Sequence, residues 1–480
     1  MNYIKQLGKD SVIYGIGGAL SKSVSFFLLP IYTRIFTPAE FGTIEMMMSL
    51  VGLLTALLVM GMDSAQSFFY FEQQNKGTQA QKNVITSILQ WRVVWGTVVM
   101  FIVGAIAPLL NHWFFDDQMT NLHFLFSFSG AFFMTIMAQS AEIFRLLYRP
   151  WTYIFINLVN SVLTASIILL AVIYFDQGIL GYFVGISIGS LFALFFGWYM
   201  AREYLNFKKL QYKNWIKFIK FGAPLLPASL SFYLMSSLDR WFINYHHGSI
   251  ELGVYAVGAQ ISLIILLIIE TFRKAWWPIS MNAMHRDNGQ DFFRLIARLY
   301  VGTVMVGIMF LAFFSGSIID LMFPEEYHSA KNIMIILLWQ SFFYGFYMIA
   351  SAGLIKEKKT VLMLYISIIA LVVNIVLNAF LVPYYAGIGA AIATVISFFV
   401  LVFVSLIFSE RLWKVGFQVR LYIFQIIITL ITISINYYIF DNIYMQTVSL
   451  IIYLFILFYT TINKEEWSYF IKLLLRRGGE

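Results

Sequence analysis

The sequence predicts an all-α polytopic membrane protein with 14 transmembrane helices, arranged as two six-helix lobes plus two extra C-terminal helices. Of its 480 residues, 60% are hydrophobic and 12% are charged, and the mean hydropathy is +0.79. Soluble domains have about 45–50% apolar and about 25% charged residues, so this chain has too little polar surface to stay in water. The absence of Cys excludes disulfide scaffolds, thiolate metal sites and cysteine nucleophiles.

The predicted helices follow from the apolar runs of the chain. A helix needs about 20 apolar residues to cross about 30 Å of hydrocarbon. The apolar start of the chain is too long for a signal peptide, so we interpret it as a retained first span. In chain order, the runs lie at 11–33, 42–71, 84–110, 119–145, 150–175, 179–201, 216–240, 252–282, 293–320, 331–354, 360–382, 386–409, 418–440 and 442–462.

The distribution of basic residues predicts the orientation. With these spans, nearly all Lys and Arg residues fall on one side together with both termini, and that side is expected to be cytoplasmic. The opposite side holds only Arg34, Arg240 and Lys331, together with the acidic pairs 116–117 and 325–326. The net charge of +8 therefore reflects membrane topology, and no nucleic-acid partner is expected.

Short matches predict an internal repeat. Glu40-Phe41-Gly42 recurs as Glu251-Leu252-Gly253, and the Gly-rich start of the sixth span at 178–181 recurs at 387–390. An even number of spans separates the copies, which predicts parallel lobes. The expected divisions are 1–201 (first lobe), 202–215 (basic linker), 216–410 (second lobe), 411–462 (two extra helices) and 463–480 (interfacial tail).

Charges inside the spans indicate a functional cavity, because a buried charge in the bilayer costs about 2.5–3.5 kcal/mol on insertion scales. Lys22 lies about 16 Å into the first span. Glu270, Arg273 and Lys274 share one helical face of the eighth span. Two structural alternatives remain open: an ion pair between Lys22 and Asp63, and neutralisation of Glu270 by Lys274.

Other charges lie near expected span ends. Arg92 and the i, i+3 pair Glu142 and Arg145 are close to cytoplasmic ends, where simple solvation competes with a role in substrate binding. Arg34 and the dipeptide 239–240 (Asp-Arg) are expected at outer ends, either as an outer gate or as interfacial anchors.

Prolines predict bending elements in the first helix of each lobe. Pro30 lies in the first span, and Pro224 and Pro227 lie in the seventh. Carbonyl groups freed by proline are tolerated only beside protein or water, which favours hinges around a cavity. There is no GxxxxGK[ST] or HExxH motif, and we expect no cofactor and no metal.

Several stretches resemble the polysaccharide transporter family (Wzx-type O-antigen flippases) of the multidrug/oligosaccharidyl-lipid/polysaccharide exporter superfamily: 27–45, 61–72, 221–243, 253–278 and 358–394. The resemblance implies a transporter, not an enzyme, in the bacterial cytoplasmic membrane. It implies translocation of an undecaprenyl-pyrophosphate-linked oligosaccharide to the outer leaflet by alternating access, for O-antigen, capsule or exopolysaccharide synthesis. Further partners would be a coupling proton or sodium ion, membrane lipids and polysaccharide polymerase machinery.

The resemblance also suggests site residues. Related lipid II flippases have basic residues on helices 1 and 8 around a cationic cavity; Lys22 fits the first position, and Arg273 or Lys274 the second. Those flippases also have a basic residue early in helix 2, where this chain has Glu45.

The remaining charges complete the expected site. Arg92 and Arg145 would contribute to the cavity, and Asp63, Glu270 and Glu142 would exchange the coupling ion. Two other functions compete. A drug or cation exporter should have an acidic and aromatic cavity, and a polytopic glycan polymerase or glycosyltransferase should have a long outer loop.

Overall fold

The computed structural model describes residues 17, 23–24, 26–205, 212–439 and 443–461. Every regular element in these residues is helical, which confirms the predicted class. The main helices are α2 (Pro38–Val59), α3 (Met62–Glu72), α4 (Thr78–Phe115), α5 (Asn121–Leu146), α6 (Pro150–Leu169), α7 (Gly178–Ala201), α8 (Trp215–Gly222), α9 (Leu226–Ser262), α10 (Ile264–Ala283), α11 (Gly289–Phe313), α12 (Ser315–Met322), α13 (Ala330–Ala350), α14 (Ala352–Lys356), α15 (Thr360–Leu412), α16 (Val419–Tyr438) and α17 (Ile443–Thr461).

Eleven helices of the described part are long and apolar enough to cross a membrane. Two of them, 215–270 and 360–412, are far longer than one crossing requires. Each contains a residue with non-helical torsion angles, Gly248 in α9 and Ala386 in α15. Each therefore accommodates two of the expected spans. The first expected span is described as a helix only over Phe26–Ile35, so the count of fourteen stays a prediction.

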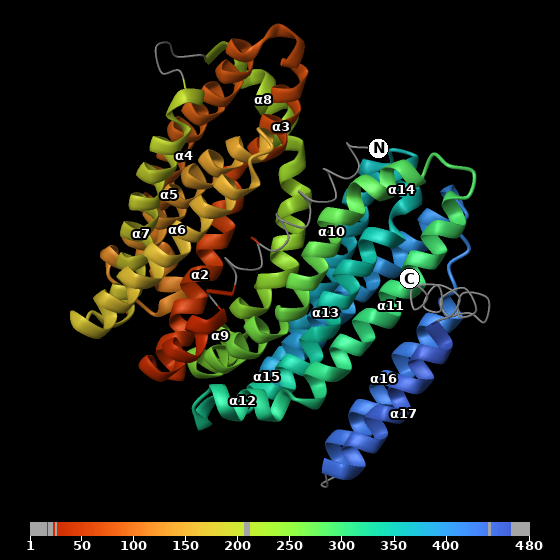
Figure 1. Cartoon of the computed structure of the whole chain (residues 1–480). Helices are drawn as coiled ribbons and strands as arrows, with labels where there is room; N and C mark the ends of the chain where they lie inside the picture. Colours follow the sequence, from red (N-terminus) through yellow and green to blue (C-terminus); the bar gives the residue numbers. More distant parts are fainter. Residues whose placement is uncertain (1–16, 18–22, 25, 206–211, 440–442, 462–480) are drawn as a thin grey trace, which may run out of the picture.

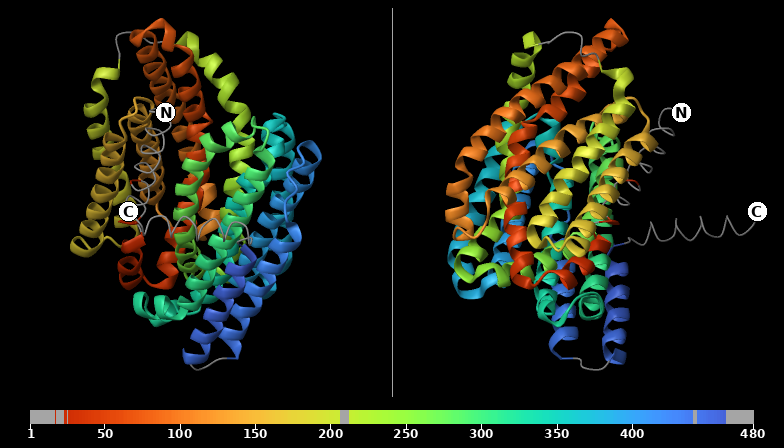
Figure 2. Two further views of the ribbon diagram at one scale, coloured as in Figure 1. Left: turned by 45° about the vertical axis from the view of Figure 1, so that its right-hand side comes forward. Right: turned by 90° about the vertical axis from the view of Figure 1, so that its left-hand side faces the viewer.

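The helices form two bodies that meet at one end of the molecule. Helices α2–α7 form the first lobe, and most of α9 to α15 forms the second, with α16 and α17 along its outer flank (Figures 1 and 2). Elements α3, α8 and α14 lie at the end where the lobes diverge, which we call the basic end because Lys76, Lys217 and Lys356 lie in or beside them. The acidic end is the opposite one, where Asp116 follows α4 and Glu325 follows α12.

The lobes are joined at the acidic end by α2 and α9. Gly42 of α2 and Gly253 of α9 are in backbone contact: a Cβ on Gly42 would lie 1.8 Å from the Ser249 oxygen, and one on Gly253 would lie 2.0 Å from the Pro38 oxygen. Gly42 and Gly253 are the last residues of the two matching tripeptides, 40–42 and 251–253, that predicted the internal repeat. The sequence repeat therefore marks the place where the lobes pack most closely.

At the basic end, α8 packs on the first lobe although the expected boundary at residue 216 assigns it to the second. Phe218 packs on Phe69 of α3, and the Trp215 Nε1 donates a hydrogen bond to the Ser87 oxygen at 3.1 Å. Lys217 Nζ lies 2.9 Å from Glu72 Oε2. The chain reaches the second lobe only after α8, through a 3-10 turn over Ala223–Leu225.

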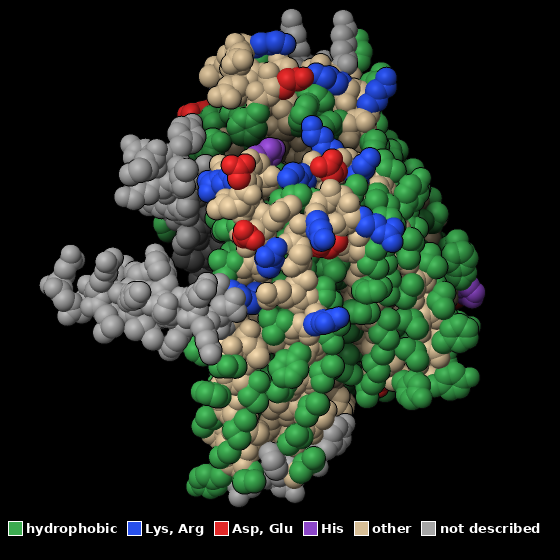
Figure 3. Space-filling model, turned by 90° about the vertical axis from the view of Figure 1, so that its right-hand side faces the viewer, with side chains coloured by type: hydrophobic (Ala, Val, Ile, Leu, Met, Phe, Trp, Pro, Cys, Tyr) green, Lys and Arg blue, Asp and Glu red, His purple; other side chains and the backbone are tan. Residues whose placement is uncertain are grey.

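The surface agrees with a membrane protein. On the face shown in Figure 3, Lys and Arg side chains gather in the half toward the basic end, and the rest is covered mainly by hydrophobic side chains. Large apolar side chains of α16 and α17, including Ile427, Ile431 and Phe455, are exposed. Such a broad apolar surface is expected where lipid replaces water.

Candidate functional site

Two helices carry the same arrangement of a glutamate followed three residues later by an arginine. On α5, the Arg145 Nε donates to Glu142 Oε1 at 2.7 Å, and on α10 the Arg273 Nε donates to Glu270 Oε2 at 3.0 Å. The guanidinium side chains are 51% and 46% exposed, whereas their glutamates are mostly buried. In each pair, a mostly buried carboxylate therefore binds a guanidinium that is still accessible.

Arg273 lies in the middle of α10, about 14 Å from its first residue. In Figures 1 and 2, α10 lies on the side of the second lobe that is nearest the first. Arg273 forms an ion pair with Glu270, and the alternative pair between Glu270 and Lys274 stays a prediction. Lys274 is the next residue of α10, and its side chain is outside the described part.

The first lobe also holds an ion pair between helices. Arg92 of α4 pairs with Asp63 in the first turn of α3, and its NH1 donates to the Thr135 oxygen of α5 at 3.0 Å. The Arg92 side chain is 2% exposed, so the expectation that it is solvated at a span end was wrong. The helix α4 begins at Thr78 and extends past the membrane edge predicted for it, which places Arg92 deep inside the lobe.

The two ionic sites of the first lobe are electrostatically connected. Asp63 interacts with Glu142 and Arg145, and both of these residues lie close to Tyr153. The structure therefore brings together four predicted residues of the first lobe. Lys22, the fifth predicted residue there, is outside the described part, and so is its alternative ion pair with Asp63.

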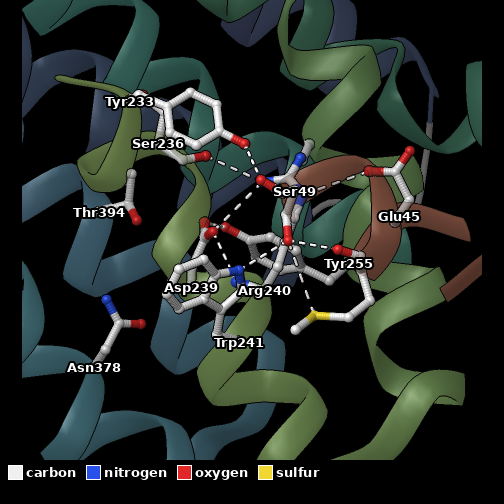
Figure 4. Close-up of polar contacts among 12 residues, drawn as sticks. Glu45, Ser49, Tyr233, Ser236, Asp239, Arg240, Trp241, Tyr255, Asn378 and Thr394 are labelled. Carbon is white, nitrogen blue, oxygen red and sulfur yellow. Dashed lines mark hydrogen bonds and ion pairs between the residues drawn. The ribbon is translucent and has the colours of Figure 1, made fainter. Parts of the chain in front are cut away.

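A second polar cluster joins the lobes near the acidic end (Figure 4). The Arg240 side chain lies between two carboxylates: its NH1 is 3.4 Å from Asp239 Oδ1, and its Nε is 3.4 Å from Glu45 Oε2 of α2. Gln260 Nε2 donates to Glu45 Oε1 at 2.6 Å. Asp239 also accepts hydrogen bonds from the Arg240 amide at 2.9 Å and from the Tyr255 hydroxyl.

This cluster corrects the expected position of Asp239 and Arg240 at an outer helix end. Asp239 is 2% exposed, and the helix continues past both residues to the break at Gly248. The predicted span ended at the charged dipeptide 239–240, but the apolar residues 241–243 (Trp-Phe-Ile) continue the helix beyond it. Arg34, in contrast, is exposed, and no ion pair within the described residues joins it to Asp239.

The prolines differ in their effects. Pro224 lies in the 3-10 turn between α8 and α9, and Pro227 lies in the first turn of α9, where a missing N–H costs little. The predicted break in the seventh span is therefore present. Pro30 lies within the helical run 26–35.

The comparisons with known proteins identify the family. The model of the family described as "Polysaccharide biosynthesis protein" matches residues 7–284, which is more than half of the chain. The chain belongs to the polysaccharide biosynthesis protein family. A second family model, MatE, matches residues 224–380 of this polysaccharide biosynthesis protein.

Named relatives are distant. Protein 1 of the Lsg locus of Haemophilus influenzae is 25% identical over 58% of this chain and 66% of its own length. A "probable low-salt glycan biosynthesis flippase", Agl15 of Haloferax volcanii, is 21% identical over 42% of this chain and 43% of its own. The chain thus spans just under two thirds of the first of these relatives and less than half of the second.

A solved structure shares the whole fold. The lipid II flippase MurJ in an inward closed conformation superimposes with a TM-score of 0.73 at 16% identity, covering 97% of this chain and 100% of that one. The chain therefore has the fold of the lipid II flippase and the multidrug exporters, as predicted. At this identity the likeness concerns the fold alone.

Sequence reasoning missed most of the cluster that joins the lobes. The residues missed include Glu45 and Ser49 of α2 and Tyr233, Trp241, Tyr255 and Gln260 of α9. A signal was present: Gly42, Glu45, Ser49 and Gly52 are spaced so that they share one face of a helix. Two glycines and two polar residues on one apolar helix are typical of a face that packs closely on another helix.

Proposed function

We propose that this polysaccharide biosynthesis protein is a flippase that moves an undecaprenyl-pyrophosphate-linked oligosaccharide from the cytoplasmic to the outer leaflet. The observation that carries the proposal is the pair of half-exposed arginines, Arg145 in the last turn of α5 and Arg273 in the middle of α10, each held by a mostly buried glutamate of its own helix. Family membership and the names of the flippase relatives support it.

The chemistry of the cargo fits this arrangement. Hydrocarbon rejects the pyrophosphate, and a guanidinium in a medium of low dielectric compensates its charge through bidentate hydrogen bonds. Arg145 and Arg273 would bind it from the two lobes, together with Lys22, Lys274 and Arg92 as the charge around them. The isoprenoid chain can remain in lipid throughout.

The carboxylates that hold the arginines provide a means of coupling. A phosphate that binds Arg273 competes with Glu270, and one that binds Arg145 competes with Glu142. A carboxylate released from its arginine is free to take up a proton or sodium ion. We propose that Asp63, Glu142 and Glu270 exchange this ion and so couple transport to an ion gradient.

The proposed cycle is alternating access between the two lobes. The basic end, where the lobes diverge, would face the cytoplasm because basic residues are retained there. The acidic end, closed by the cluster of Asp239 and Arg240, would be the outer gate, with Arg34 at its rim. Bending at Pro30, Pro224 and Pro227 would accompany the exchange.

Replacing Arg273 by Ala tests the proposal in cells that depend on this chain for surface polysaccharide. We expect surface polysaccharide to fall at least tenfold at unchanged protein level, with partial recovery in Arg273→Lys. Arg286→Ala is the matched control, because it removes an equal charge just beyond the end of α10. Normal polysaccharide in both Lys22→Ala and Arg273→Ala would exclude these residues from transport.

A drug or cation exporter is the second candidate, and the MatE match over 224–380 favours it. The paired arginines oppose it, because a cationic cargo would be repelled by them. Efflux of a cationic dye that depends on this chain, without any change in surface polysaccharide, would decide for the exporter.

A further inference from the structure

The N-terminal part of α2 carries a single buried carboxylate that reaches the other lobe. Glu45 is 7% exposed, and its two oxygens accept from Gln260 at 2.6 Å and from Arg240 at 3.4 Å. Both donors belong to α9, in the second lobe. Among the described residues, Glu45 has no hydrogen-bond partner from its own lobe.

The helix face around Glu45 is shaped for contact with α9. Four residues further along, Ser49 receives a hydrogen bond from the Trp241 Nε1 at 2.8 Å and, at its carbonyl, one from the Tyr233 hydroxyl. Gly42 and Gly52 flank this stretch, and a Cβ at Gly52 would lie 2.2 Å from the Tyr233 hydroxyl. The whole face therefore depends on the lobes being together at the acidic end.

Arg240 has other acceptors besides Glu45, whereas Glu45 depends on donors from the other lobe. Arg240 keeps the Asp239 carboxylate and donates to the Ser236 oxygen at 3.0 Å, and both acceptors belong to its own helix. In Figure 4, Asp239 and Glu45 lie on either side of the Arg240 side chain. Parting the lobes leaves Arg240 with an anion but removes both donors from Glu45.

We propose that Glu45 is a positioning residue that latches the acidic end closed through Arg240 and Gln260. Its hydrogen bonds exist only while the lobes touch, so they stabilise the closed acidic end relative to an open one. In this structure, both hydrogen-bond donors to Glu45 come from the other lobe. The inference rests on the proposed alternating access, but not on the identity of the cargo.

Distances between spin labels test the latch directly, because the chain has no Cys and accepts engineered label sites. One pair, at Gln118→Cys and Glu326→Cys, reports on the acidic end from exposed positions on the two lobes. A second pair, at Lys76→Cys and Glu357→Cys, reports on the basic end. The measurement uses the full chain in lipid nanodiscs without added cargo.

We expect Glu45→Ala to raise the population with a long distance at the acidic end at least tenfold, with a matching shorter distance at the basic end. Gln260→Ala, which keeps every charge, should have the same effect as Glu45→Ala: a longer distance at the acidic end and a shorter one at the basic end. Glu325→Ala, an exposed acid at the same end, is the control and should leave both unchanged.

Unchanged distances in folded Glu45→Ala and Gln260→Ala would overturn the latch. That result would leave the proposed cargo untouched, because no cargo is present in the experiment. Conversely, a latch that opens as expected in a chain that fails to move the glycolipid would refute the proposed function alone.

Discussion

At the scale of single residues, the charges inside the helices are already paired without cargo. Glu142–Arg145 and Glu270–Arg273 are neutralised within one helix, and Asp63–Arg92 between two. A charge in the hydrocarbon region without such a partner would be costly. In the proposed function, an anionic cargo would therefore have to compete with these carboxylates for the arginines.

The pair Asp63–Arg92 should show an asymmetric response to mutation. Asp63 is half exposed and can be solvated alone, whereas Arg92 is buried and cannot. We expect Asp63→Asn to lower the free energy of unfolding by about 3 kcal/mol, since it leaves a buried charge without its partner. Arg92→Met should cost about 1 kcal/mol. Denaturation of the purified protein in mixed micelles measures both.

The double variant gives the sharper result. The double variant Asp63→Asn/Arg92→Met leaves no charge at this ion pair. Its stability should therefore equal that of Arg92→Met alone. If the two single effects simply add, the ion pair does not stabilise the lobe and Arg92 has another partner.

Sequence reasoning indicated the pair Glu142–Arg145 within one helix, but it did not find the partners that Arg92 and Arg240 have on other helices. Glu142–Arg145 follows from the geometry of any α-helix, because residues three apart are neighbours. The partners of Arg92 and Arg240 lie on other helices and depend on how the lobes pack. No local pattern in one sequence contains that information, so solvation and a cavity role stayed open for Arg92, and Glu45 was interpreted only as a departure from a family pattern.

At the scale of helices, two spans are broken at the same level and touch there. The second span is interrupted at Met60 and Gly61, both in the left-handed region, and the seventh at Ala223–Leu225. A Cβ on Gly61 would lie 2.3 Å from the Gly222 oxygen. Because α8 packs on α3, the segments beyond both breaks form one packed unit at the basic end.

Alanine substitutions test this contact. Gly61→Ala combines backbone strain with a steric clash, so it should destabilise the protein by about 2 kcal/mol or more. Gly222→Ala has the close contact without a positive φ and should cost less. Gly104→Ala is the control, because a Cβ there meets nothing within 4 Å. The order of the three unfolding free energies is the result to measure, and equal values would contradict the contact.

The positions of the helices were predicted better than their breaks. Hydropathy located nearly every span within a few residues, because lipid requires a long apolar run. Proline correctly indicated the break before α9, and the expected gap between 382 and 386 coincides with the break at Ala386, three residues after Pro383; the positive φ of an alanine at this place was not predicted. The chain changes direction at Ala386, and the turn is held by the hydrogen bond from the Gly387 amide to Glu251 Oε1 at 3.1 Å.

At the scale of the whole molecule, the two lobes meet through a polar latch at one end and diverge at the other. The arginines proposed to bind the cargo belong to different lobes, Arg145 to the first and Arg273 to the second. In the proposed cycle, a cargo that binds both arginines would cross the membrane centre when the acidic end opens and the basic end closes. The architecture thus connects recognition of the pyrophosphate to the movement of the lobes.

Transport of the glycolipid by the purified protein tests the central claim most directly. The chain is reconstituted into vesicles with an undecaprenyl-pyrophosphate-linked oligosaccharide, and a membrane-impermeant glycosidase measures the cargo in the outer leaflet. With an ion gradient, we predict that the accessible fraction rises with time for the natural chain and Arg286→Ala but not for Arg273→Ala. The account would be contradicted if vesicles with the natural chain and protein-free vesicles had the same accessible fraction under gradients of either direction.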